Sequence, residues 1–133
     1  MSQVFLDSNV VLYLLSADAC KADKAEALLS QQPYISVQVL NEVTSVCRRK
    51  FSMPWPEVQD LLLALKANCK VLPLTVDTHA LAVSIAQQHQ LSFYDAHIVA
   101  TAIQSSASTL LSEDMHEGLG VGPIKIQNPF AVH

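Results

Sequence analysis

The feature that most constrains the fold is the alternation of short apolar runs with longer helical segments. The runs are continuous rather than interleaved with polar residues, as in strands that are covered on both faces. They predict strands over 3–6, 34–36, 71–74, 109–111 and 124–126. The segments between them predict helices over 10–16, 22–30, 37–50, 56–68, 78–90 and 92–103. This order predicts an α/β fold, with a central short parallel sheet of about five strands flanked by helices on both faces.

Helix-capping residues set several of these boundaries. The segment 7–9 offers N-caps for the first helix, and Pro56 fits the first position of another. Asp77 or Thr78 is expected to cap the helix that ends near residue 90, and Ser92 with Asp95 resembles a capping box. The glycine-containing segment 119–123 is interpreted as a loop, because no helix follows it as a phosphate-binding loop would require.

Length and composition predict one globular domain over residues 1–133. Half of the residues are hydrophobic and 15% are charged, which argues against disorder. The first residues lack the basic region of a signal peptide, and the apolar stretches are too short to span a bilayer. We therefore expect a soluble cytoplasmic protein with no membrane partner.

Three widely spaced cysteines, Cys20, Cys47 and Cys69, form no Cys-x-x-Cys pair, so we expect buried free thiols rather than disulfides or a zinc site. The five histidines contain neither a His-x-x-x-His pair nor an HExxH motif. The nucleophile elbow, the Walker motif and the dinucleotide fingerprint are also missing.

Four acidic residues each adjoin an apolar segment that is predicted to lie in the core: Asp7, Glu42, Asp95 and Asp114. Asp7 and Asp114 follow strands, Asp95 lies in the first turn of a helix, and Glu42 lies in the first or second turn of another. Ligands of open parallel sheets bind at the carboxyl ends of the strands, and all four acids can reach that rim. Glu113 and Glu117 are alternatives for the position of Asp114. Each acid also has a purely structural explanation, as an N-cap, a turn residue or part of a solvated helix face.

Carboxylates gathered at one rim need a cation. Two of them ~4 Å apart repel by about 4 kcal/mol at a surface-like dielectric. An oxygen-only ligand set favours Mg²⁺ or Mn²⁺ over zinc. Asn9 and Ser112 are candidates for supporting contacts, and the basic run Arg48, Arg49 and Lys50 is a candidate for contacting an RNA backbone or simply a favourable helix end.

The net charge of −4 does not exclude a nucleic-acid substrate. The four acids account for all of it, and metal ions at such a site would reverse the local field.

These segments resemble the motifs of the PIN domain family, in particular its small VapC-type toxins. Residues 5–13 look like an apolar strand that ends in Asp-x-Asn. Residues 36–43 resemble the second motif, which contains a Glu. Residues 92–102 resemble the stretch that carries the third acid, and residues 110–114 resemble the fourth motif, a Ser-x-Asp after a strand. The family's last motif often continues to a Phe, whereas Met115 to Glu117 follow Asp114 here.

The resemblance implies a ribonuclease that depends on Mg²⁺ or Mn²⁺, a homodimer, and an antitoxin partner. Asp7, Asp95 and Asp114 would be the principal metal ligands, with Glu42 completing the cluster. A PIN-type RNA-processing nuclease that is not a toxin and a non-catalytic interaction module stay open as alternatives. A phosphatase with Asp7 as its nucleophile would need a second acid two residues later, where the sequence has Asn9. A signalling receiver domain would need an adjacent acidic pair, but Ser8 follows Asp7. Both alternatives are therefore disfavoured.

Overall fold

In the computed structural model, which describes residues 3–115 and 117–130, a six-stranded sheet has the order β3-β2-β1-β4-β6-β5. The strands are β1 (Val4–Leu6), β2 (Tyr34–Ser36), β3 (Lys70–Leu72), β4 (Thr109–Leu111), β5 (Gly120–Val121) and β6 (Ile124–Gln127). The first four and β6 pair in parallel, while β5 pairs antiparallel with β6. The predicted α/β class with a short parallel sheet is therefore confirmed.

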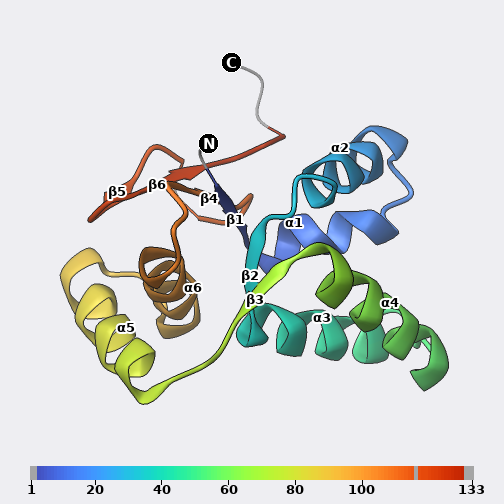
Figure 1. The fold of residues 1–133 in the computed structure, drawn as a ribbon, viewed down its shortest axis with the longest axis horizontal. Helices are drawn as coiled ribbons and strands as arrows, with labels where there is room; N and C mark the ends of the chain where they lie inside the picture. Colours follow the sequence, from blue (N-terminus) through green and yellow to red (C-terminus); the bar gives the residue numbers. More distant parts are fainter. Residues whose placement is uncertain (1–2, 116, 131–133) are drawn as a thin grey trace.

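The helices gather into two groups, one on each side of the sheet (Figure 1). One group comprises α5 (Val76–His89) and α6 (Phe93–Gln104), and α6 contacts β2, β4 and β6. The other comprises α1 (Ser8–Leu12), the 3-10 turn η1 (Tyr13–Leu15), α2 (Ala19–Leu29), α3 (Val37–Arg49) and α4 (Trp55–Asn68). With both faces covered, strand residues such as Phe5, Ile35 and Leu110 are fully buried, which explains their continuous apolar character.

The N-caps of α1, α3 and α5 stand at the end of a strand or within three residues after it. Asp7 accepts from the Ser8 backbone N–H, and Ser36 Oγ from that of Val39. Thr75 Oγ1 accepts from the Thr78 N–H. Each cap satisfies an otherwise unpaired donor and starts a helix at the carboxyl edge of the sheet. Polar side chains from separate elements are thereby brought to one rim.

Several local predictions were wrong. The cap of α5 is Thr75, not Asp77 or Thr78, because the helix begins earlier. The first helix begins at Ser8 and passes into a 3-10 turn after Leu12.

The segment 119–123 is not simply a loop, since Gly120–Val121 forms β5 in a hairpin with β6. A strand of two residues is too short to show periodicity in the sequence. The turn that joins β5 to β6 contains Gly122 at φ +55°, a conformation that favours glycine.

The cysteines are free, as expected, but only Cys47 and Cys69 are buried. Cys20 is exposed because it lies in the first turn of α2, where Asp18 caps the helix at the surface.

Candidate active site

Asp7 lies where three strands end together. Its backbone N–H donates to the Leu111 carbonyl at 3.0 Å, which joins the end of β1 to the end of β4. The next residue of that chain segment, Ser112, donates its own N–H to the carbonyl of Gln127 at the end of β6. Asp7 is 4% exposed, so the structure holds an ionisable group in the core at this rim.

Hydrogen bonds hold both oxygens of Asp7. Oδ1 accepts from the Ser8 N–H at 2.7 Å, and Oδ2 accepts from the Ser112 hydroxyl at 2.8 Å. The Asn9 amide donates to Oδ2 at 3.4 Å and also to Ser112 Oγ at 3.3 Å. Asn9 and Ser112, expected to be supporting residues, thus do contact Asp7.

The environment of Asp7 raises its pKa from 3.8 to about 6. Burial is the largest cause, and the charges of Glu42 and Asp95 add to it, while the hydrogen bonds from Ser112 and Ser8 oppose it. A buried carboxylate beside two others is poorly stabilised by the protein alone, so this position favours a cation.

Glu42 reaches Asp7 through a residue whose role the sequence did not indicate. The Ser8 hydroxyl donates to Glu42 Oε2 at 2.5 Å and lies 3.4 Å from Asp7 Oδ1. Gln38, one turn earlier on α3, donates to the other oxygen of Glu42 at 3.3 Å. Neither Ser8 nor Gln38 was expected at the site. The contact of Gln38 with Glu42 could have been predicted from the sequence, because residues four apart on a helix are neighbours on its surface.

Asp95 connects the remaining acids. It lies in the first turn of α6, where Ser92 Oγ accepts its backbone N–H at 3.2 Å. Its pKa is raised first by burial and then by the charges of Asp114 and Glu42, against a lowering contribution from Ser92. Because Asp95 and Glu42 also raise the pKa of Asp7, these three acids lie within electrostatic range of one another, and Asp114 joins them through Asp95.

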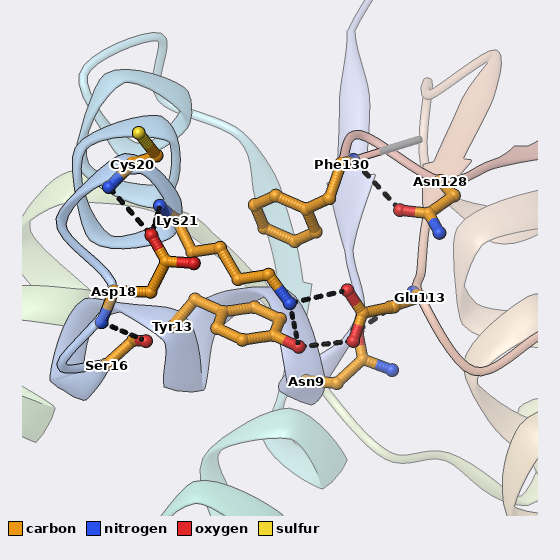
Figure 2. A network of polar contacts seen from close by, with 9 residues as sticks. All are labelled: Asn9, Tyr13, Ser16, Asp18, Cys20, Lys21, Glu113, Asn128 and Phe130. Carbon is orange, nitrogen blue, oxygen red and sulfur yellow. Dashed lines mark hydrogen bonds and ion pairs between the residues drawn. The ribbon is translucent and has the colours of Figure 1, made fainter. Parts of the chain in front are cut away.

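Glu113 and Glu117 are engaged elsewhere. Glu113 accepts a hydrogen bond from Tyr13 and pairs with Lys21 at 3.4 Å, as Figure 2 shows. Glu117 Oε2 accepts from the Asn128 N–H at 2.9 Å. Asp114 is exposed. Of these three acids, it is the one whose charge raises the pKa of Asp95. The geometry therefore favours Asp114 as the fourth acid, and its catalytic role stays a prediction.

The donor set fits a hard divalent cation in its chemistry, since the predicted ligands are all carboxylates and include no thiolate or imidazole. Among residues 3–115 and 117–130, however, no group of three or more His, Cys, Asp or Glu side chains stands in an arrangement that holds a metal ion. The carboxylates share one rim without closing into a ligand cage, so side-chain rotation would have to complete it.

The three basic residues at the end of α3 are not equivalent. The Arg48 guanidinium lies 4.5 Å from the centroid of the Trp55 ring and donates to the Met53 carbonyl at 2.8 Å, so it packs on its own chain. Arg49 is exposed. Lys50 and Asn9 both line a groove of about 440 Å³. Lys50 is therefore the one of these three basic residues that shares a groove with a residue contacting Asp7, and its contact with RNA stays a prediction.

In the part of the chain that the structure describes, no helix has the length and apolar character needed to cross a membrane.

Comparison with known proteins gives a family and a fold. The family model described as PIN domain matches residues 4–116. No curated protein matches the sequence significantly.

Three solved structures are similar in fold. A toxin–antitoxin complex from Klebsiella pneumoniae has 23% identity and a TM-score of 0.73, and covers 98% of this chain and 100% of its own. FitAcB from Neisseria gonorrhoeae has 20% identity and a TM-score of 0.70, with 98% and 100% covered. The sarcin–ricin loop cleaving toxin VapC20 from Mycobacterium tuberculosis has 19% identity and a TM-score of 0.63, with 81% and 87% covered.

Proposed function

We propose, from the premise that this chain belongs to the PIN domain family, that it is a metal-dependent endoribonuclease. Its substrate would be an RNA phosphodiester, and its cofactor Mg²⁺ or Mn²⁺. The observation that carries the proposal is the rim of four acids, in which buried Asp7 has its pKa raised to about 6 by burial and by neighbouring carboxylates. A rim with this charge supports cation binding far better than it supports an inert interaction module.

The oxygens of Asp7, Asp95 and Asp114 would hold the cation, with Glu42 binding directly or through a water. Such an ion would supply Lewis-acid chemistry to the phosphodiester, to the attacking water and to the leaving alkoxide. Ser8 and Gln38 orient the Glu42 carboxylate, which leaves Glu42 suited to align the attacking water. Ser112 and Asn9 fix the rotation of the Asp7 carboxylate.

Attack by water, rather than by the ribose 2′-hydroxyl, determines the products. Cleavage would leave a 3′-hydroxyl on one fragment and a 5′-phosphate on the other. A 2′,3′-cyclic phosphate would instead indicate attack by the 2′-hydroxyl and would contradict the proposed chemistry.

The test is cleavage of single-stranded and structured RNA in Mn²⁺, in EDTA, and by Asp95→Asn. The expected result is Mn²⁺-dependent cleavage that EDTA abolishes. Asp95→Asn should reduce this cleavage by about 100-fold, the upper end of the loss seen when a residue that only supports a metal ligand is replaced. Asp77→Asn, an exposed acid on α5, is the matched control and should cleave like the wild type. Cleavage that persists in EDTA and in Asp95→Asn would contradict the mechanism.

We further propose that the protein is the toxin of a toxin–antitoxin pair that acts in the cytoplasm as a homodimer. The structural neighbours that are described as toxin–antitoxin complexes support this assignment. Expression of the wild-type protein should arrest growth, Asp95→Asn should not, and co-expression of a neighbouring antitoxin gene should restore growth. Normal growth under wild-type expression would favour an RNA-processing nuclease, and a strict monomer at high concentration would contradict the dimer.

A further inference from the structure

We infer that Tyr13, Lys21 and Glu113 form a clamp that orients Asn9 on Asp7, so that Glu113 is a positioning residue and not a ligand of the cation. We call these three residues the Tyr13 clamp. The inference rests on the proposed function and deepens it, because it separates Glu113 from the neighbouring Asp114.

Both carboxylate oxygens of Glu113 are occupied inside the clamp (Figure 2). The Tyr13 hydroxyl donates to Oε1, and Lys21 Nζ lies 3.4 Å from Oε2. Lys21 also donates to the Tyr13 hydroxyl at 3.1 Å, which closes a triangle among the three side chains. A carboxylate held by a charged donor and a hydroxyl would have to give up both partners to bind a cation.

Aromatic packing holds the clamp in place. Lys21 Nζ lies 4.4 Å from the centroid of the Tyr13 ring and 5.6 Å from that of Phe130. The Tyr13 and Phe130 rings pack edge to face with centroids 4.7 Å apart. Helix α2, η1 and the segment after β6 therefore converge on the side chain of Glu113, as Figure 2 shows.

The clamp reaches Asp7 through the backbone of Glu113. Its N–H donates to Asn9 Oδ1 at 3.2 Å, which fixes the amide oxygen of Asn9 away from Asp7. The amide nitrogen is then directed to Asp7 Oδ2 and Ser112 Oγ. If the amide were reversed, its oxygen would face the Asp7 carboxylate and neither group could donate. Release of Glu113 would therefore free Asn9 to turn and would loosen the carboxylate that the cation needs.

The experiment measures Mn²⁺ affinity by titration calorimetry in Tyr13→Phe and Lys21→Met, with circular dichroism to establish that each variant is folded. Each variant should bind Mn²⁺ about 10-fold more weakly with unchanged stoichiometry, a loss typical of residues that support metal ligands. Lys21→Arg keeps the cation and should restore binding. Lys24→Met removes an exposed lysine of the same helix and should bind like the wild type. In RNA cleavage, kcat should fall while KM stays unchanged.

The double variant Lys21→Met with Glu113→Gln separates the two roles of Glu113. If Glu113 acts only within the clamp, the double variant should lose no more affinity than the larger single loss, because both changes break one network. If Glu113 binds the cation, Glu113→Gln alone should lose far more Mn²⁺ affinity than Lys21→Met, because it removes a ligand and not only the partner of that ligand, and that outcome would overturn the inference. Wild-type affinity in both Tyr13→Phe and Lys21→Met would also overturn it while leaving the proposed function intact. Failure of the wild type to bind Mn²⁺ at all would overturn both proposals.

Discussion

Asp7→Asn should stabilise the metal-free protein at neutral pH while abolishing its activity. The pKa of Asp7 is about 6 in the folded protein against 3.8 ordinarily. At 1.36 kcal/mol per pKa unit, this difference makes ionised Asp7 cost about 3 kcal/mol of folding free energy. The cost applies because Asp7 is almost fully buried and its charge is not screened by solvent.

The sign of the pH dependence follows from proton linkage. Between pH 3.8 and about 6 the folded state holds a proton on Asp7 that the unfolded state has released. The contribution of Asp7 to the free energy of unfolding therefore decreases as pH rises through this window. Below pH 3.8 the residue is protonated in both states, and its penalty disappears.

Asparagine removes the charge but disturbs the hydrogen bonds around it. One side of the new amide can accept from the Ser8 N–H, while its nitrogen would face Ser112 Oγ and the donating amide of Asn9. That conflict costs about 1 kcal/mol, so the net gain at pH 7 should be about 2 kcal/mol. At about pH 4 the gain should vanish or reverse.

Urea unfolding in EDTA at both pH values measures the effect. Asp18→Asn removes one exposed carboxylate that caps α2 and controls for the change in net charge. Saturating Mn²⁺ at pH 7 should raise the stability of the wild type and leave Asp7→Asn unchanged. A destabilisation of the same size at both pH values would refute the reasoning, because it would show that lost hydrogen bonds, not relief of a buried charge, dominate.

Three further predictions concern particular contacts. Ser8→Ala removes the 2.5 Å bond to Glu42 and should weaken Mn²⁺ binding by about 10-fold in calorimetry, whereas exposed Ser84→Ala should not. Lys50→Gln should weaken RNA binding and reduce its salt dependence, because Lys50 and Asn9 line the same groove. Arg48→Gln should instead lower the free energy of unfolding by about 1 kcal/mol, because it removes the contact with the Trp55 ring. Gly122→Ala should lower the free energy of unfolding in urea by about 1–2 kcal/mol, because Gly122 has φ +55°. An added Cβ would make only ordinary van der Waals contact, so the loss would measure backbone strain and not a steric clash.

Hydrophobic pattern and local capping made much of the fold predictable from the sequence. Strands buried on both faces are continuous apolar runs, so β2 and β4 were predicted with their observed bounds. The cap at Ser92 was likewise predicted from the spacing of polar residues. Periodicity needs several residues to be visible, which is why the two-residue β5 was missed.

The sequence by itself determined which carboxylates adjoin the core, because Asp7 follows a buried strand and Asp95 opens a buried helix. Only the tertiary structure decided which polar groups surround them. Ser8 meets Glu42 across 34 positions of sequence, and Tyr13 meets Glu113 across 100. Such contacts depend on strand order and on the rotation of each helix, and neither leaves a local pattern in the chain. The pairing of Glu113 with Lys21 therefore depends on β4 lying beside β1 and could not be predicted from the sequence. The same holds for the different roles of Glu113 and Asp114.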